Sequence, residues 1–219
     1  MNPGRFLAEL PGLFDDYPHS ETPRDGRFAE IVEAVSGLAE PNNLALVNLA
    51  ARLLEPGESY VEAGSYHGRS LIAAMLDNGG RDFVAIDDFS LGDGSRRELE
   101  ANLERFGLSG ATVLEGDVFE VLRSSALGDR VVGVYYYDAG HAYEQQLDGL
   151  RLAEQYLASP ALVIVDDSDW ERVARATRDY LAGQPRARLA LELPGKEGGR
   201  PQWWEGMQIL VWDDDEGAS

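Results

Sequence analysis

Residues 60–70 read Tyr-Val-Glu-Ala-Gly-Ser-Tyr-His-Gly-Arg-Ser, and this stretch decides the fold. A short apolar strand runs into a turn that holds Gly64 and Gly68, where glycine lets the backbone turn tightly and approach a ligand closely. The G-x-x-x-G spacing is neither the G-x-G-x-x-G of a dinucleotide site nor the G-x-x-x-x-G-K-[ST] of a phosphate loop. An acid, Glu62, precedes the turn, and a carboxylate there suits a ligand with a positive amino group. The alternative is a plain strand-to-helix turn.

Apolar strands alternate with amphipathic helices beyond this stretch. Five strands that alternate with helices predict an α/β fold with a Rossmann-like, doubly wound and mostly parallel sheet. Two closing strands without a helix between them predict an antiparallel edge pair, and so seven strands in all. The expected strands are 60–63, 83–86, 111–114, 131–137, 161–165, 188–193 and 207–212. The expected helices are 67–77, one opened by the capping box of Ser95 and Glu98, 119–122, 142–157, and one opened by Ser168 and Glu171 that ends near residue 181.

An N-terminal extension, residues 1–55, precedes this alternation. Four prolines within residues 1–25 indicate an irregular or partly mobile arm, and helices are expected over 27–38 and 41–54. The second helix is apolar around most of its circumference, which favours burial against the sheet or a partner chain, so a homodimer is one expectation. The sheet domain is expected over 56–213, followed by an acidic tail, 214–219.

The composition excludes several classes of function. No cysteine occurs, which excludes disulfides, thiolate metal sites and cysteine nucleophiles. The chain has 39 acidic and 19 basic residues, and the resulting formal charge of −20 repels a phosphate backbone, so we expect no nucleic-acid partner. No apolar run is long enough to cross a membrane, and the first residues lack the apolar stretch of a signal peptide, so we expect no membrane partner and a cytoplasmic location.

Acidic residues also follow the second and third predicted strands. Asp87 and Asp88 could accept the hydroxyl hydrogens of a ribose, and Asp117 could accept from the exocyclic amine of an adenine. The simpler alternatives are a solvated strand end and a helix N-cap. Because the carboxyl ends of parallel strands share one edge, these acids, Glu62 and the glycine turn should form one constellation. Its groups match the ribose, adenine and amino acid of S-adenosylmethionine.

Two further motifs follow the fourth and fifth predicted strands. Residues 137–144 read Tyr-Asp-Ala-Gly-His-Ala-Tyr-Glu, and Asp166 and Asp167 follow the fifth strand. With the D-x-x-H-x-Y-E pattern and the later D-D pair, the chain resembles class I S-adenosylmethionine-dependent methyltransferases of the macrocin O-methyltransferase kind over roughly residues 58–213. With the carboxylates and glycines above, the cofactor-binding residues expected are Glu62, Gly64, Ser65, Gly68, Ser70, Asp87, Asp88, Asp117 and Asp138.

The resemblance also implies a metal site. In metal-dependent members of the group, magnesium is held by one carboxylate after the fourth strand and two after the fifth, which implies Asp138, Asp166 and Asp167 here. A substrate hydroxyl on the metal would lose its proton more readily. Some relatives carry a second aspartate before the histidine as a proposed base, but Gly140 stands there in this chain. His141 is therefore the candidate catalytic base beside Asp138. The alternatives are a backbone-bonded helix start for His141 and helix capping for the aspartate pair.

These observations predict an enzyme that transfers a methyl group from S-adenosylmethionine to a hydroxyl of a small molecule, such as a sugar or natural product, with or without a metal. Two alternatives remain. A nucleotide-dependent oxidoreductase would share the sheet, although the missing G-x-G-x-x-G counts against it. A non-catalytic binding protein could share the whole fold. Trp203 and Trp204, before the last strand, are expected either to wall a substrate pocket or to pack at the sheet edge.

Overall fold

A computed structural model describes residues 1–92, 94–197 and 200–214, so most of the expected acidic tail, 215–219, lies outside the described residues. The helices are α1 Pro3–Glu9, α2 Arg27–Ala34, α3 Pro41–Arg52, α4 Arg69–Met75, α5 Arg96–Arg105, α6 Val118–Arg123, α7 Tyr143–Ala153 and α8 Glu171–Gly183, with 3₁₀ turns η1 Leu10–Leu13, η2 Ser125–Leu127 and η3 Glu154–Tyr156. The strands are β1 Glu58–Ala63, β2 Asp82–Asp87, β3 Thr112–Glu115, β4 Val131–Tyr137, β5 Leu157–Val165, β6 Ala187–Leu193, β7 Lys196–Glu197, β8 Arg200–Pro201 and β9 Met207–Trp212.

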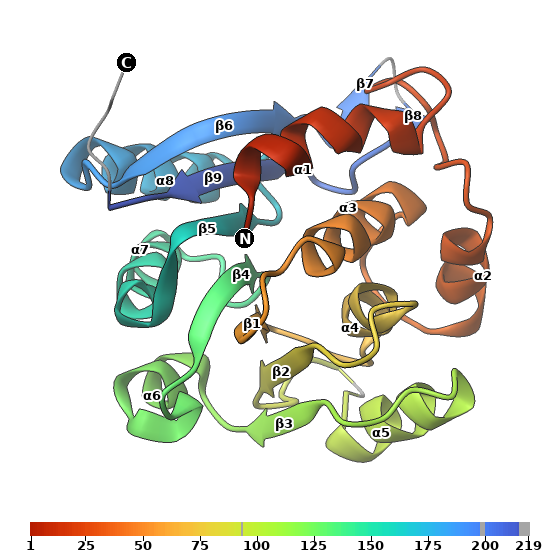
Figure 1. Cartoon of the computed structure of the whole chain (residues 1–219), viewed down its shortest axis with the longest axis horizontal. Coiled ribbons are helices and arrows are strands. Elements are labelled where there is room, and N and C mark those ends of the chain that lie inside the picture. The colour runs from red at the N-terminus through yellow and green to blue at the C-terminus, as the bar shows by residue number, and fades with distance from the viewer. Residues whose placement is uncertain (93, 198–199, 215–219) are drawn as a thin grey trace.

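Seven strands form the central sheet in the order β3-β2-β1-β4-β5-β9-β6 (Figure 1). Strands β1 to β5 are parallel to one another, as the alternation with helices predicts. β9 pairs antiparallel with β5 and with β6, which confirms the predicted antiparallel closing pair. The carboxyl ends of five parallel strands therefore meet at one edge of the sheet, where ligands bind in folds of this kind.

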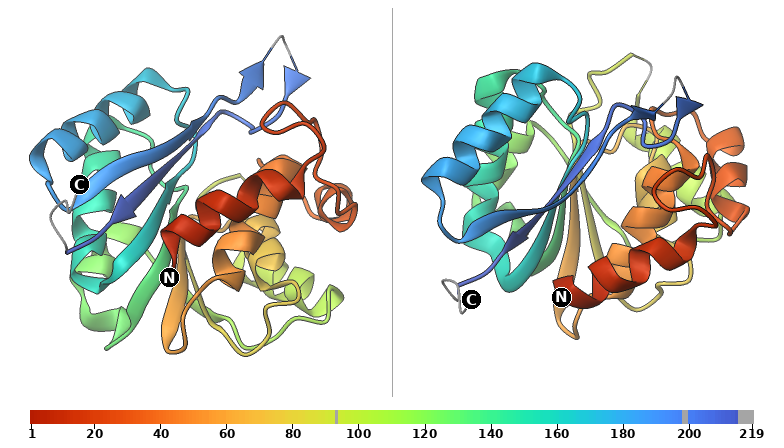
Figure 2. Two further views of the ribbon diagram at one scale, coloured as in Figure 1. Left: turned by 45° about the horizontal axis from the view of Figure 1, so that its top comes forward. Right: turned by 90° about the horizontal axis from the view of Figure 1, so that it is seen from above.

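Helices cover both faces of the sheet (Figure 2). Helices α1 to α5 pack on one face and α6 to α8 on the other, and each side has its own apolar core. Alternate strand residues point to opposite faces, so Tyr60 and Tyr136 belong to the first core while Val61 and Tyr135 belong to the second. A strand buried on both faces must be apolar at nearly every position, as β4 is. Within the described residues, no helix is both long and apolar enough to span a membrane.

The start of the chain is more ordered than its prolines indicate. Helix α1 begins at Pro3, and Asn2 caps it by accepting a hydrogen bond from the Arg5 backbone N–H at 2.9 Å. Proline at the first helical position fits because its missing N–H would have no partner there. Phe6 and Leu10 are fully buried in the first core. The expectation of an irregular arm is therefore wrong for residues 3–13.

Two expected helix boundaries also differ. The Ser95 cap is confirmed, since its hydroxyl accepts from the Glu98 N–H at 3.2 Å. Helix α8, however, begins at Glu171 and not at Ser168, because a turn closed by the Trp170 N–H and the Asp167 carbonyl at 3.0 Å comes first. The helix expected over 142–157 ends at residue 153, and β5 already begins at residue 157.

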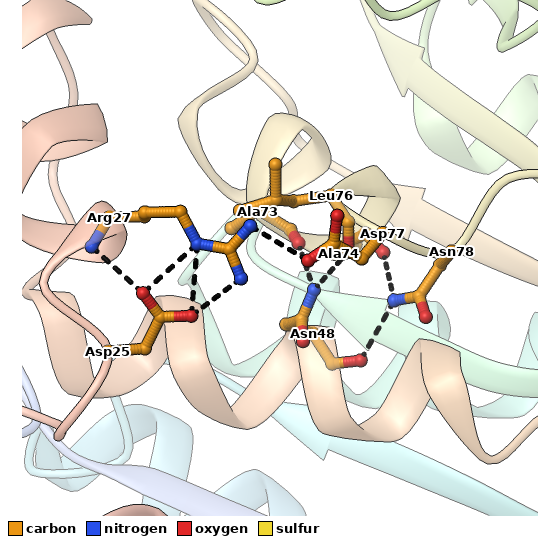
Figure 3. A network of polar contacts seen from close by, with 8 residues as sticks. All are labelled: Asp25, Arg27, Asn48, Ala73, Ala74, Leu76, Asp77 and Asn78. Atoms are coloured by element: carbon orange, nitrogen blue, oxygen red, sulfur yellow. Dashed lines mark hydrogen bonds and ion pairs between the residues drawn. The ribbon is translucent and has the colours of Figure 1, made fainter.

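Helix α3 is buried inside a single chain, between the sheet, α2 and α4. Its Asn48 side chain donates to the carbonyls of Ala73 in α4 and of Leu76 just after it, at 2.8 and 2.7 Å (Figure 3). Beside it, Arg27 at the start of α2 pairs with Asp77 beyond the end of α4, at 2.8 Å. The apolar side chains of α3 are buried in the first core, which accounts for its apolar circumference without a partner chain, so the homodimer stays a prediction.

Candidate active site

The glycine turn after β1 brings two strands of the sheet into close approach. Gly64 has φ +88°, and a Cβ at this position would lie 1.9 Å from the Asp138 carbonyl oxygen. Its own N–H donates to the Ile86 carbonyl at 2.8 Å. Gly68, with φ +84°, is the left-handed residue from which α4 begins. Glycine is thus required by conformation at both positions and by space at Gly64.

Glu62 lies beneath this turn and is completely buried. The hydroxyls of Tyr60 and Ser70 donate to its two carboxylate oxygens at 2.8 and 2.9 Å. Burial nevertheless raises the pKa of Glu62 to about 8, so the group is mostly neutral at pH 7. A ligand that brought an ammonium group to this place would restore the charge of the carboxylate.

Asp87, at the end of β2, holds the turn from the side. Its carboxylate accepts from the backbone N–H groups of Ser65 and Tyr66, at 2.6 and 2.7 Å, and from that of Phe89 at 2.6 Å. Asp88 is exposed and accepts from the Ser90 N–H at 2.9 Å. Asp87 therefore fixes the cradle that was expected to surround the ligand, and its role toward a ribose stays a prediction.

Asp117 follows β3 and caps α6 by accepting from the Glu120 N–H at 2.9 Å. The N-cap alternative for Asp117 is therefore confirmed. The carboxylate of Asp117 is also exposed, at the edge of the sheet where an adenine was expected. A separate hollow, lined by residues that include Glu58, Asp82 and Arg130, lies at the opposite edge, where the strands begin. It shares no residue with the candidate site.

Three polar side chains converge after β4 and β5. The His141 Nε2 atom lies 2.9 Å from Asp167 Oδ2 and 3.6 Å from Asp138 Oδ1. The short contact is an ion pair and not an aligned hydrogen bond, since the imidazole N–H does not point at the carboxylate. Asp167 has φ +54°, which turns its side chain toward His141. We call Asp138, His141 and Asp167 the acid–histidine group.

The acid–histidine group fits a divalent cation. One ligand atom from each residue lies within 4.8 Å of the others, and Asp167 Oδ1 is buried without a hydrogen-bond partner. Two carboxylates suit magnesium, and the imidazole also suits transition metals. Asp166, the third expected metal ligand, lies apart from these ligand atoms. Its carboxylate accepts hydrogen bonds from the Tyr136 hydroxyl and from the Asp167 N–H.

Burial and close charges shift the pKa values in this group. Burial raises the pKa of Asp138 to about 6; His141 opposes the shift and Asp167 adds to it. Burial and repulsion from Asp138 and Asp167 raise the pKa of Asp166 well above its ordinary value. Burial would lower the pKa of His141, but the two carboxylates outweigh it and raise the value to about 9. His141 is therefore a cation at pH 7 while both carboxylates keep their charge.

The start of α3 holds two asparagines that the sequence patterns did not single out. Both side chains are buried, and Oδ1 of Asn42 and both amide atoms of Asn43 have no hydrogen-bond partner among the described residues. A buried amide needs a polar partner, so the start of α3 fits a polar ligand.

Trp203 does not line the acid–histidine group. It is completely buried and packs edge-on against Phe14, with ring centroids 5.3 Å apart, while its indole N–H donates to the Pro18 carbonyl. The packing alternative therefore describes Trp203. The aromatic residue beside the group is Trp170, whose ring centroid lies 5.1 Å from that of His141. The expected cap at Ser168 had placed Trp170 inside a helix, which concealed it.

A comparison with protein families identifies the domain. The model of a methyltransferase domain matches residues 61–168, which run from β1 to the turn after β5 and include the glycine turn and the acid–histidine group. Over these residues the chain carries an S-adenosylmethionine-dependent methyltransferase domain. Glu62 and the glycine turn are the groups expected beside the amino-acid part of this cofactor, and Asp87 and Asp117 stand where its nucleoside was expected, so these assignments stay predictions.

Relatives of the methyltransferase share its fold at low sequence identity. The uncharacterized protein R132 of Acanthamoeba polyphaga mimivirus is 23% identical over 129 residues, 56% of this chain and 57% of that protein, so little more than half of this curated relative's length is matched. An O-methyltransferase from Bacillus cereus in complex with SAH has a TM-score of 0.65 at 15% identity, covering 96% of this chain and 99% of that one.

Two further solved structures are similar over nearly the whole methyltransferase. The O-methyltransferase TomG from Streptomyces achromogenes, involved in tomaymycin synthesis and bound to SAM, has a TM-score of 0.65 at 16% identity, with coverage of 97% and 99%. CalS11, a TDP-rhamnose 3′-O-methyltransferase of calicheamicin biosynthesis, has a TM-score of 0.61 at 22% identity, with coverage of 97% and 94%. At these identities the structures establish the fold.

Proposed function

We propose that the methyltransferase methylates a hydroxyl oxygen of a small molecule, and that a divalent cation, magnesium as first candidate, assists at the acid–histidine group. The observation that carries this proposal is the convergence of Asp138, His141 and Asp167 within 4.8 Å at the edge where the glycine turn lies. S-adenosylmethionine supplies a methyl group that is already activated by its sulfonium charge. The protein must therefore position the acceptor and take up its proton.

The protein's own groups divide these tasks. Gly64, Gly68 and Asp87 shape the cradle for the cofactor, with Glu62, Ser65, Ser70, Asp88 and Asp117 as further proposed contacts. Asp138 and Asp167 would hold the cation, with His141 as third ligand or as base. Asp166 would not be a ligand, because its carboxylate turns toward the Tyr136 hydroxyl. It would instead hold the backbone of Asp167 by accepting from its N–H. A cation here would lower the pKa of a bound hydroxyl.

His141 can serve as a base only when the carboxylates beside it are neutralised. With both charges present its pKa is about 9, and it keeps its proton at pH 7. Neutralising Asp138 and Asp167 removes the attraction that holds this proton, and the imidazole can then accept one from the substrate. Whether His141 can act as a base therefore depends on whether a cation is bound to the two carboxylates.

The acceptor is proposed to be a sugar or a natural product. Support comes from CalS11, which acts on TDP-rhamnose, and TomG, which is involved in tomaymycin synthesis. The closer resemblance to the macrocin O-methyltransferase group is part of the same proposal, as are the cytoplasmic location and the homodimer.

The experiment incubates the enzyme with S-adenosylmethionine and a panel of sugars and phenols, and reads methylated products by mass spectrometry. Chelator should abolish transfer, and magnesium or manganese should restore it. If the metal role is wrong and His141 is the sole base, activity should survive chelator at a pH above about 9, where the imidazole loses its proton, and should drop about 10²–10⁴-fold in His141→Ala. Full activity in His141→Ala under chelator would contradict both arrangements.

A further inference from the structure

The turn into α8 places a second pair of side chains beside the acid–histidine group. Trp170 lies 5.1 Å from His141 between ring centroids, with the ring planes at 63°. The guanidinium of Arg172 in turn lies over the Trp170 ring, with its Cζ atom 4.6 Å from the ring centroid. These two distances limit the separation of the guanidinium from the imidazole to about 10 Å. Arg172 is thus held next to the proposed site of methyl transfer.

Arg172 is a cation that no carboxylate among the described residues pairs with. It makes no ion pair with any residue that the structure describes, although the sequence holds 39 acidic residues and only 19 basic ones. Two neighbouring arginines of the same helix are paired: Arg175 with Asp179 at 3.8 Å and Arg178 with Glu171 at 2.9 Å. Arg172 is exposed, so its charge is available to a ligand.

The guanidinium carbon of Arg172 lies over the indole ring of Trp170. A guanidinium held over an aromatic face in parallel keeps its N–H donors available in its own plane. In that geometry a guanidinium binds a carboxylate or a phosphate through two parallel hydrogen bonds. Trp170 is then a positioning residue, and Arg172 is the group that would contact the ligand.

We propose that Arg172 binds an anionic group, a carboxylate or a phosphate, on the methyl acceptor. This inference rests on the proposed function, since it takes the acid–histidine group as the place of the reacting hydroxyl. One ring that carries the hydroxyl and the anionic group spans the distance between the two. Asp138, Asp167 and a net charge of −20 would otherwise repel an anionic acceptor, and Arg172 offsets that repulsion locally.

The test compares acceptors that differ only in the anionic group. Catechol is paired with 3,4-dihydroxybenzoate, and rhamnose with rhamnose 1-phosphate, in calorimetric titrations of the enzyme saturated with SAH. The wild type should bind one anionic member at least about tenfold more tightly than its neutral partner, the effect of a charge-assisted hydrogen-bond pair. Which pair shows the preference tells whether the group is a carboxylate or a phosphate.

Variants assign the preference to Arg172. Arg172→Ala should abolish it, Arg172→Lys should restore part of it, and Trp170→Leu should reduce it because the charge is no longer held. Arg178→Ala, which removes a paired arginine of the same helix, should keep it. In turnover with the anionic acceptor, Arg172→Ala should raise KM more than it lowers kcat.

The outcomes separate this inference from the proposed function. If the enzyme binds SAH but binds the charged and neutral acceptors equally well, or binds none of the four acceptors, the role of Arg172 alone is overturned. A preference that survives in Arg172→Ala overturns it as well. A wild type that does not bind SAH contradicts the cofactor assignment, and this inference falls with it.

Discussion

Replacing His141 with glutamine should remove much of the pH dependence of stability on the alkaline side. In the folded, metal-free protein, Asp138 and Asp167 raise the pKa of His141 from 6.5 to about 9, against the effect of burial. One pKa unit corresponds to about 1.4 kcal/mol, so the protonated imidazole contributes about 3 kcal/mol to the free energy of unfolding. The side chain is 24% exposed, so solvent screens the pair only in part.

The sign follows from the direction of the shift. Because the folded pKa lies above the unfolded one, the contribution is complete below about pH 6.5 and is lost as the pH rises through about 9. Glutamine carries no charge, so the variant never has this contribution. It should be less stable than the wild type by up to about 3 kcal/mol at pH 6, and the two should converge near pH 10.

Urea unfolding in the presence of chelator, at several pH values from 6 to 10, measures both curves. Arg188→Gln is the control, because it removes an exposed positive charge from β6, and it should follow the wild type. Parallel curves for the wild type and His141→Gln would refute the reasoning, since they would mean that the two carboxylates do not hold a proton on His141.

Three other substitutions, one of them with a matched control, test the surroundings. Gly64→Ala should cost about 3 kcal/mol in urea unfolding, because it adds a clash with the Asp138 carbonyl to the strain of φ +88°. Gly57→Ala has the same φ with nothing within 4 Å and should cost only about 1 kcal/mol, so equal losses would contradict the close approach. Tyr136→Phe should cost about 1–3 kcal/mol by leaving the buried Asp166 without its hydroxyl donor, and an unchanged unfolding midpoint would remove that contact from the account. Asp87→Ala should weaken SAH binding by about 1.5–3 kcal/mol, and calorimetry that finds wild-type affinity would exclude Asp87 from the cofactor site.

The alternation of strands and helices was enough to predict the sheet, because a strand buried on both faces must be apolar throughout, as β4 is. Helix α1 was missed for a local reason. Its cap is a single residue, Asn2, followed by Pro3, and the apolar spacing on which the prediction relied gives no weight to such a pair.

The direction of the two aspartates after β5 could not be read from the sequence. In an extended strand Asp166 and Asp167 point to opposite faces, and Asp166 does continue the strand, on the side of Tyr136. The left-handed backbone at Asp167, with φ +54°, breaks the alternation and returns its carboxylate to His141. The sequence identified the acids of the site, but only the backbone turn determines which of them meet.

The same turn explains why Trp170 and Arg172 were missed. An S-x-x-E box at Ser168 and Glu171 normally opens a helix, and such a helix would have begun before the tryptophan. The Asp167–Trp170 turn moves the start of α8 to Glu171 and leaves the indole beside His141. Local capping patterns cannot show this, because the turn is held by contacts with a distant segment, the Ser168 N–H donating to the Gly206 carbonyl at 3.1 Å.

The most direct test of the central claim is a calorimetric titration of the wild type with SAH, with NADH titrated in parallel. If the glycine turn, Glu62 and Asp87 form a site for S-adenosylmethionine, SAH should bind saturably at one site per chain and NADH should not compete with it. Saturable binding of NADH without binding of SAH would contradict the account, because it would assign the carboxyl edge of this sheet to a nicotinamide cofactor.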